Sequence, residues 1–324
     1  MVQRGARQSD TDVIEQACPA GQPPARVLCD WGSSTLRAFL EHGGRVVERR
    51  NGPGIGQLGT RSANEVLEDI LAPWRAQRHL ERIVLCGMVG SRNGLLEVPY
   101  VRAPATATQW RAGAAVVSRA EDTLSILPGI QAQNFRDVAD VMRGEETQIF
   151  GALVLEPSLA AARQLLVLPG THCKWVEVRD GRIARLQTYC TGELYELLSN
   201  RSSLLRLGGA PEPDEDAFDI GLRNAARFDL SANLFETRTA QLIEGRSAGW
   251  ARALLSGLLI GAEVHSMLAL HAAARGPLTL IGEPALTARY RRALESWRIA
   301  TQQLDGDECV LAGLRAAAAG MQGL

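Results

Sequence analysis

Two stretches of the chain share one pattern of apolar and polar positions. In each, an apolar run ends in a short turn of glycine and hydroxyl residues, and a second apolar run follows; the stretches cover residues 26–40 and 165–178. This pattern is typical of a strand, a tight turn and an antiparallel strand. A shift of 138 residues superposes Gly32 on Gly170 and also superposes the hairpin glycines that follow them. We therefore interpret the chain as an internal duplication and expect an α/β fold with two similar lobes.

The periodicity elsewhere predicts alternating helices and strands. Helices are expected at residues 62–78 and 253–274, a further helix is opened by residues 140–148, and strands are expected at residues 82–86, 124–130 and 278–282. The most apolar helix, at residues 253–274, is interrupted by Glu263, His265 and His271. Such polar interruptions favour a buried helix over a membrane span.

The first glycine and hydroxyl turn has the composition of a phosphate-binding loop. Gly32 lets the backbone approach an anion, and Ser33, Ser34 and Thr35 can donate hydrogen bonds to it. Asp30 stands where a carboxylate could hold a water-bound Mg²⁺. The loop is not a P-loop, because no Gly-Lys-Ser/Thr follows, and an ordinary hairpin turn is the alternative interpretation.

The second turn predicts a matching loop. Gly170 and Thr171 repeat the glycine and the hydroxyl, and His172 or Lys174 could add local positive charge for a nucleotide. The alternative is that His172 is a structural histidine and Lys174 a strand position. Thr191, further along the chain, is expected to cap a helix.

Three other stretches carry candidate chemistry. A glycine-rich polar loop at residues 87–94 ends a strand and contains Ser91 and Arg92. The acidic stretch at residues 140–148 could supply a catalytic carboxylate or could be only a solvated helix start. A buried strand that ends at Gly282 could receive a base or ribose against its backbone.

Composition limits the classes of partner. The chain has 324 residues with 46% hydrophobic and 22% charged residues, and 35 basic residues against 36 acidic ones leave a net charge of -1. We therefore expect neither nucleic acid nor an anionic membrane as a partner.

The six cysteines form no C-x-x-C pair, which predicts reduced thiols, no disulfide and no zinc. Residues 1–25 are expected to be a disordered leader without the apolar core of a signal peptide, and a cytoplasmic location follows.

Taken together, the motifs resemble the 2-dehydro-3-deoxygalactonokinase family. The resemblance runs from Arg26 nearly to the C-terminus and is carried by residues 30–34 with Arg37, 87–92 with 99–101, 140–148, 168–176 and 191–194. It implies the actin/hexokinase/Hsp70 ATPase superfamily, with two ribonuclease-H-like lobes and the nucleotide and sugar acid in the interlobe cleft. The implied lobes are residues 26–144 and 145–307, with a C-terminal helix at residues 308–324 that packs back on the first lobe.

The resemblance also implies an activity, which is ATP- and Mg²⁺-dependent phosphorylation of 2-dehydro-3-deoxy-D-galactonate to its 6-phosphate in galactonate catabolism. On this chain it assigns nucleotide binding to the loops at residues 30–35 and 170–174 and to Gly282, with Asp30 on the metal side. Leu168 departs from the superfamily pattern, since many relatives have an acidic residue there. The catalytic base is therefore expected among Glu145, Glu146 and, behind them, Asp140.

A substrate with a carboxylate beside a ketone suits a planar guanidinium. Arg92, with Ser91, is the first candidate to bind it, and Arg143 is the second. Three other functions stay open at this stage, namely another sugar or sugar-acid kinase, an exopolyphosphatase-like phosphohydrolase and a non-catalytic ATP-driven binding protein. A homo-oligomer is possible.

Overall fold

A computed structural model describes residues 25–205, 214–227, 229–271 and 276–321. The chain divides into two units. The first contains the described residues up to Pro99 together with Gly113–Pro128, and the second contains Tyr100–Ala112 and the described residues from Gly129 onward. The predicted leader at residues 1–25 lies outside the described residues except for Ala25, which begins the first strand.

The first unit is built on one mixed sheet. Its elements are β1 (Ala25–Trp31), β2 (Thr35–His42), β3 (Arg45–Pro53), a 3-10 turn η1 (Ile55–Gln57), α1 (Ala63–Arg75), β4 (Leu80–Gly87), a 3-10 turn η2 (Met88–Gly90), β6 (Ala115–Ser118) and β7 (Thr123–Ile126). The strand order is β3-β2-β1-β4-β7-β6. β1, β2 and β3 are antiparallel neighbours, whereas β4 and β7 continue the sheet in parallel with β1.

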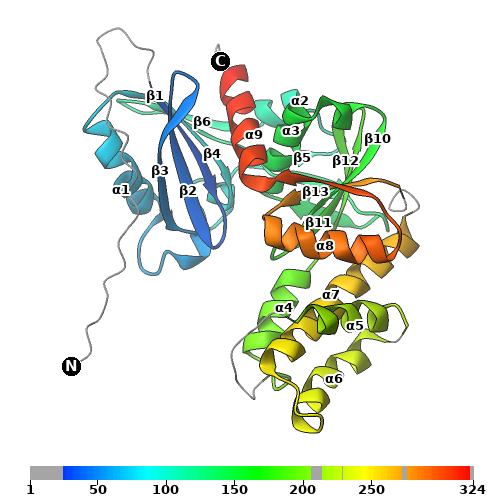
Figure 1. Ribbon diagram of the computed structural model, residues 1–324. Helices are drawn as coiled ribbons and strands as arrows, with labels where there is room; N and C mark the ends of the chain where they lie inside the picture. Colours follow the sequence, from blue (N-terminus) through cyan, green and yellow to red (C-terminus); the bar gives the residue numbers. More distant parts are fainter. Residues whose placement is uncertain (1–24, 206–213, 228, 272–275, 322–324) are drawn as a thin grey trace, which may run out of the picture. The chain divides into compact units, whose positions relative to one another are not determined.

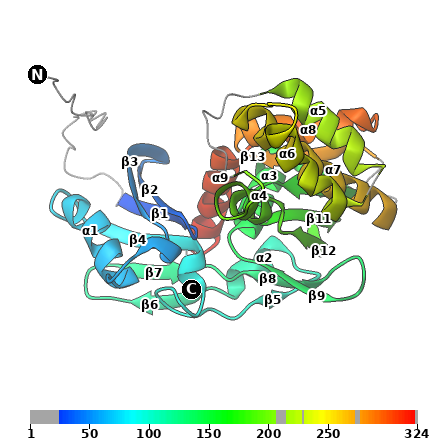
Figure 2. The same ribbon diagram turned by 90° about the horizontal axis from the view of Figure 1, so that it is seen from below.

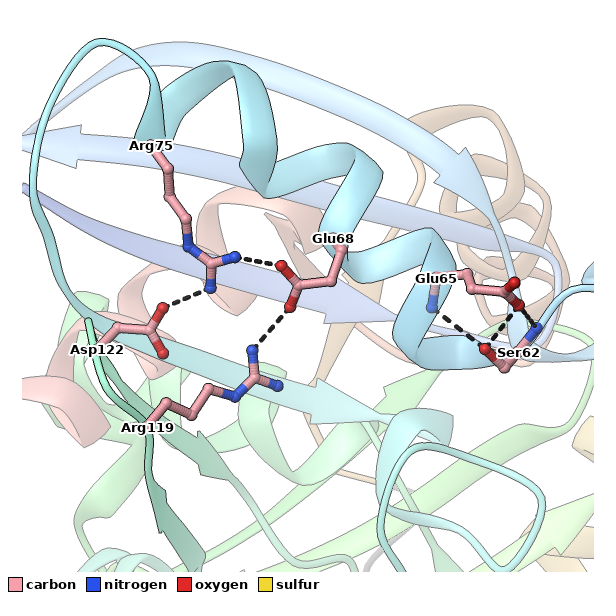
Figure 3. Close-up of polar contacts among 6 residues, drawn as sticks. All are labelled: Ser62, Glu65, Glu68, Arg75, Arg119 and Asp122. Atoms are coloured by element: carbon pink, nitrogen blue, oxygen red, sulfur yellow. Dashed lines mark hydrogen bonds and ion pairs between the residues drawn. The ribbon is translucent and has the colours of Figure 1, made fainter.

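Helix α1 is held to this sheet by its apolar face and by charged groups at its ends. Val66, Leu67 and Trp74 are buried in the core of the first unit. At the helix start, Ser62 and Glu65 form a capping box in which each side chain accepts the other residue's backbone N–H (Figure 3).

The end of α1 is tied to the far edge of the same sheet. Arg75 pairs with both Glu68 and Asp122, and Arg119 donates to Glu68 at 2.8 Å (Figure 3). Asp122 precedes β7, so this network joins the helix to the strand end.

The second unit contains a five-stranded sheet, a small three-stranded sheet and most of the helices. Its strands are β5 (Val101–Arg102), β8 (Ile130–Gln133), β9 (Ala139–Met142), β10 (Arg163–Leu168), β11 (Cys173–Arg179), β12 (Arg182–Tyr189), β13 (Leu278–Gly282) and β14 (Thr301–Asp305). Its helices are α2 (Ala107–Ala112), α3 (Glu145–Leu155), η3 (Pro157–Ala160), α4 (Thr191–Asn200), α5 (Glu215–Ala225), α6 (Leu230–Leu242), α7 (Ala248–Leu270), α8 (Pro284–Ser296) and α9 (Gly306–Gly320). Figure 1 shows α8 and α9 on opposite sides of β13.

The two main sheets confirm the predicted duplication. The larger sheet of the second unit has the order β12-β11-β10-β13-β14, with β10, β11 and β12 antiparallel and β13 and β14 parallel to β10. The first unit repeats this arrangement as β3-β2-β1-β4-β7. This is the order of a ribonuclease-H-like lobe, so the α/β fold expected from the sequence is correct for each unit.

The predicted helix start in the acidic stretch was wrong. Asp140 and Met142 belong to β9, which pairs antiparallel with β8, and α3 begins only at Glu145. Gly144 has φ of 118°, a conformation that glycine tolerates best, and it turns the chain from the strand into the helix. The predicted acidic cluster therefore spans a strand-to-helix junction.

The second unit also takes more of the chain than expected. Residues 129–144 were assigned to the first lobe, yet β8 and β9 pack against β12 in the second unit. The C-terminal helix was expected to pack on the first lobe, residues 26–144. Helix α9 contacts α2, whose residues 107–112 had been assigned to that lobe, and it packs most extensively against α3. Glycines permit this close approach, since a Cβ at Gly151 would lie 1.8 Å from the Cys309 carbonyl oxygen and one at Gly313 would lie 2.0 Å from that of Thr147.

Helix α7 is long and apolar enough to cross a membrane by length and composition. However, 72% of its apolar window is buried inside the protein. Leu254, Leu258 and Val264 lie in the core of the second unit, and α5 and α6 pack beside the helix (Figure 2). Such burial is typical of a core helix.

Candidate functional site

The first predicted phosphate loop, which we call loop 1 (residues 30–35), contains the tight turn between β1 and β2 and the strand residues beside it. The Gly32 N–H donates to the Thr35 carbonyl at 2.9 Å, and the side chains of Ser33 and Ser34 are exposed. The carbonyls of Gly32 and Ser33 accept the backbone N–H groups of Ile55 and Gly56 at 3.0 and 2.9 Å. The turn is thus fixed by backbone hydrogen bonds from residues 55–56, while its serine side chains stay exposed.

Asp30 lies at the end of β1 and is only 15% exposed. Its Oδ2 forms an ion pair with Arg37 on the neighbouring strand, and the Cys86 thiol donates to its Oδ1 at 3.7 Å. Gly87 follows on β4, where a Cβ would lie 2.6 Å from the Trp31 carbonyl oxygen. The close strand packing therefore fixes the carboxylate at the edge of loop 1.

The second predicted loop, loop 2 (residues 170–174), is fixed by the start of α4. A Cβ at Gly192 would lie 2.3 Å from the Gly170 carbonyl oxygen, so only glycine fits there, and the Glu193 N–H donates to the Thr171 carbonyl at 2.9 Å. Within the described part of the chain, and apart from its two neighbours in sequence, no residue has a heavy atom within 4 Å of a Cβ built on Gly170. Loop 2 therefore presents an open backbone surface.

A pocket of about 310 Å³ adjoins loop 2 within the second unit. Its lining combines apolar side chains with a few polar ones: Gly170, Thr191, Gly192, Tyr195, Ser256, Leu259, Ile260, Glu283, Ala285, Leu286, Arg289 and Tyr290. Arg289 donates to Ser256 at 2.9 Å. Such a cavity suits a flat, partly apolar ligand that carries a few hydrogen-bonding groups.

A buried carboxylate fixes one wall of this pocket. Glu263, on α7, is 3% exposed and accepts hydrogen bonds from Tyr290 at 2.8 Å, from Trp175 at 2.7 Å and from Thr191. Burial raises the pKa of Glu263, whereas these donors lower it. Thr191 was expected to cap α4, but Cys190 occupies the cap position and the Thr191 hydroxyl points to Glu263.

Gly282 and Glu283 connect the end of β13 to the same region. A Cβ at Gly282 would lie 3.6 Å from the Pro169 carbonyl oxygen, so this glycine adjoins the residues that lead into loop 2. The Glu283 carboxylate accepts the N–H groups of Ala285 and Leu286, both at 2.9 Å, and thereby caps α8.

Two of the predicted residues lie away from the open part of loop 2. Lys174 is 6% exposed, and its Nζ donates to the Val141 carbonyl at 3.1 Å and to the Thr188 hydroxyl at 2.9 Å. Asp140 accepts the N–H and hydroxyl of Thr188 at 2.8 and 2.7 Å. Both side chains therefore link β9 to β11 and β12, which favours a structural role for each.

The two glutamates at the start of α3 differ in environment. Glu145 is half-buried, and its Oε2 accepts the Arg143 N–H at 3.1 Å. Glu146 is fully buried, and both of its oxygens accept the Gly144 N–H, at 2.9 and 2.8 Å. Burial, together with the charge of Glu145, raises the pKa of Glu146 from 4.5 to about 8, although the Gly144 N–H opposes this shift.

This raised pKa predicts a pH-dependent stability. Between about pH 4.5 and pH 8 the unfolded chain ionises Glu146 while the folded chain keeps it protonated, so the folded state loses stability as the pH rises through this range. We expect Glu146→Gln to remove the loss. Measured by urea unfolding, the free energy of unfolding of the variant minus that of the parent should grow by up to about 1.4 kcal/mol per pH unit. Over the whole range the difference should reach a few kcal/mol. A stability difference that stays constant from about pH 5 to about pH 8 would contradict this assignment.

Arg143 lies beside these glutamates on an aromatic surface. Its guanidinium carbon stands 4.2 Å from the centroid of the Tyr100 ring. Tyr100 in turn covers Gly129, where a Cβ would lie 2.7 Å from the ring. Stacking of this kind restricts a guanidinium to one plane, which suits the recognition of a carboxylate.

The other predicted substrate residues belong to the first unit. Arg92 is exposed, and Ser91 follows η2. Among the residues that the structure describes, none offers a hydrogen-bond partner to the buried Ser91 Oγ.

Sequence reasoning missed several residues that build these sites. Tyr100 and the Gly192 segment were noticed only as parts of motifs, and Arg289 and Tyr290 lie on a helix without a distinctive pattern. The one available signal was the sequence Thr-Gly-Glu at residues 191–193, because a glycine in the first turn of a helix indicates close backbone packing.

Known proteins match this chain over most of its length. The family model described as 2-keto-3-deoxy-galactonokinase matches residues 30–317. A relative in Rhizobium meliloti (strain 1021) that bears the name 2-dehydro-3-deoxygalactonokinase is 37% identical over 298 residues, which cover 89% of this chain and 95% of the relative. The 2-dehydro-3-deoxygalactonokinase of Escherichia coli (strain K12) is also 37% identical, over 90% of this chain and 97% of its own.

A solved structure agrees with these matches. The crystal structure of a protein from Sinorhizobium meliloti, described as a 2-dehydro-3-deoxygalactonokinase, superposes with a TM-score of 0.80 at 34% identity. The match covers 92% of this chain and 100% of the other.

Proposed function

The chain belongs to the 2-keto-3-deoxy-galactonokinase family, and from that membership we propose how its own residues divide the work of phosphoryl transfer. The activity is that of a 2-dehydro-3-deoxygalactonokinase, a phosphotransferase with an alcohol group as acceptor. The phosphoryl donor is ATP, as the kinase family implies. We further propose that the accepting hydroxyl is the terminal one, at C6, and that the product enters galactonate catabolism.

The nucleotide binds the second unit in this proposal. The pocket beside loop 2 takes the adenosine part, and the backbone of Gly170 and Thr171 meets the phosphates. The observation that carries this step is that Gly170 belongs both to loop 2 and to the pocket lining. His172, which is exposed, adds a donor to the phosphates from the same loop. The burial of Lys174 argues against a direct contact of its ammonium with the nucleotide.

Loop 1 supplies hydroxyl donors to phosphate, and Asp30 is the carboxylate on the metal side. A carboxylate is the ligand type that Mg²⁺ prefers, and Asp30 fits because Arg37 engages Oδ2 while Oδ1, among the residues that the structure describes, meets a weak thiol donor. When bound, Mg²⁺ would neutralise part of the charge on the phosphates.

Glu145 is the general base in this proposal. As the acceptor hydroxyl attacks the γ-phosphorus, a new O–P bond forms, the bond to the β,γ-bridging oxygen breaks and the hydroxyl proton passes to the carboxylate. Glu145 is half-buried at the start of α3 and uses one oxygen for the Arg143 N–H. Glu146, with a pKa of about 8, is mostly protonated at neutral pH and is better suited to fix the turn at Gly144.

Arg143 binds the carboxylate of the sugar acid in this proposal, because its guanidinium is stacked on Tyr100 and its backbone N–H donates to the base. The sequence had ranked Arg92 first and Arg143 second as residues that bind the substrate, and this proposal reverses that order. Arg92 and Ser91 contribute to the acceptor side from the first unit. We also propose that the protein lies in the cytoplasm and that it forms a homo-oligomer.

A coupled kinase assay over a panel of acceptors tests the function. With ATP and Mg²⁺ we expect turnover of 2-dehydro-3-deoxygalactonate and slower turnover of its C4 epimer, since the discrimination must be made by side chains around one carbon. Polyphosphate and a reaction without acceptor serve as controls. Faster turnover of another sugar acid would replace the substrate assignment, and phosphate release without acceptor would favour the phosphohydrolase alternative.

A further inference from the structure

Three side chains with the donor atoms of a transition-metal site meet beside loop 2. The imidazole of His172, the thiol of Cys190 and the carboxylate of Glu193 have donor atoms that all lie within 4.8 Å of one another. His172 Nε2 is already 2.8 Å from Glu193 Oε2. The three side chains are exposed, so a cation from solvent can reach them.

The backbone that carries these side chains is fixed. His172 belongs to loop 2, and Cys190 and Glu193 belong to the start of α4, which is joined to loop 2 by the Glu193 N–H and by the close packing of Gly192 on Gly170. Cys190 also follows directly after β12, whose last residue pairs with Cys173 at the start of β11. The three ligands are thus held on connected backbone, and only side-chain rotation is needed to draw them together.

The chemistry of the set selects a borderline or soft cation. One imidazole nitrogen, one sulfur and one carboxylate oxygen match Zn²⁺, which takes three protein ligands and leaves a fourth position open in many sites. A thiolate does not favour Mg²⁺, which prefers oxygen ligands only. On binding, the Cys190 thiol releases its proton to solvent and the sulfur coordinates the metal.

We propose that His172, Cys190 and Glu193 form a Zn²⁺ site and that Zn²⁺ bound there inhibits the kinase in competition with ATP. The binding step stands on the geometry alone, whereas the inhibition rests on the proposed function, in which His172 and loop 2 meet the phosphates. Zn²⁺ holds His172 and the start of α4 in one arrangement, and Gly170 and Gly192 in the same segment line the nucleotide pocket.

Cobalt provides the test of binding because Co²⁺ replaces Zn²⁺ and gives a thiolate-to-metal absorption band. Titration of the full chain with Co²⁺, without nucleotide, should give one equivalent of a thiolate-bound species, and Zn²⁺ should displace it. Cys190→Ser should abolish the band, and Glu193→Gln should weaken Zn²⁺ binding by about tenfold or more. Cys18→Ser and His79→Ala, which change another thiol and another exposed imidazole, should leave both readouts unchanged.

This spectrum does not depend on turnover, so it can fail or succeed separately from the kinase assignment. A parent protein without the band, or a band unchanged in Cys190→Ser, overturns the site. For the inhibition, the half-inhibitory concentration of free Zn²⁺ in a metal buffer should rise with ATP and should be about tenfold higher or more in Cys190→Ser. Equal inhibition of the parent and Cys190→Ser overturns the inhibitory role.

Discussion

Replacing Glu145 by glutamine is expected to lower kcat by about 10²–10⁴-fold, which is the usual contribution of a general base. Glutamine keeps the size of the side chain and can still accept the Arg143 N–H through its carbonyl oxygen, so the turn at the start of α3 should persist. It cannot accept the proton of the sugar hydroxyl. The loss should therefore appear in kcat for the sugar acid, while the affinity for ATP stays within a few-fold of the parent.

The matched control for this change is Glu156→Gln, at the other end of α3, which should leave kcat unchanged. Steady-state kinetics with saturating ATP and equilibrium binding of a fluorescent ATP analogue provide the two readouts. If Glu145→Gln keeps kcat within a few-fold of the parent and Glu146→Gln loses it, the base is Glu146. If neither variant loses activity, the base does not lie at the start of α3.

Removing the side chain of Arg143 is expected to lower kcat/KM for the sugar acid by about 10²–10³-fold. The estimate follows from the loss of charge-assisted hydrogen bonds to a carboxylate, each of which contributes about 1.5–3 kcal/mol. In Arg143→Ala the change should fall mainly on KM for the sugar acid, and KM for ATP should stay near its parent value. Arg143→Lys should recover only part of the loss, because an ammonium cannot bind the carboxylate in two places or stack on Tyr100 in the same way.

Arg92→Ala is the matched comparison, since Arg92 is also an arginine predicted to bind the substrate but is exposed and belongs to the first unit. We expect it to cost less than Arg143→Ala. A larger effect at Arg92, with Arg143→Ala within about threefold of the parent, would restore the order predicted from the sequence. Circular dichroism and thermal unfolding of both variants would distinguish a binding effect from a loss of folding.

Much of the fold could be predicted because its signals are local. Apolar runs around a glycine turn identified β1, β2, β10 and β11, and the repeat of two glycine turns at the same spacing identified the duplication. The secondary structure of residues 140–144 could not be predicted in this way. Acidic residues before an apolar run are typical of a helix start, but hydrogen bonds from β8 and from Thr188 keep Asp140 in a strand.

The same distinction between local signals and distant contacts applies to the candidate site. Its loops follow from glycine and hydroxyl residues that are adjacent in sequence, and these were placed correctly as turns between strands. The role of a charged side chain depends on its distant neighbours, as Lys174 illustrates. Lys174 lies near the start of β11, and its ammonium points away from the open part of loop 2 because it donates hydrogen bonds to Val141 and Thr188.

The sequence by itself determined the duplicated α/β architecture, the two glycine and hydroxyl turns and the family resemblance, since each rests on short motifs and on their order and spacing along the chain. Only the tertiary structure placed Arg143 on Tyr100 and separated the environments of Glu145 and Glu146. It also brought the donor atoms of His172, Cys190 and Glu193 within 4.8 Å of one another, a proximity that the spacing of the cysteines does not indicate. The physical reason is that burial, charge and metal-binding geometry depend on which residues folding brings together, and the separations in sequence do not specify that arrangement.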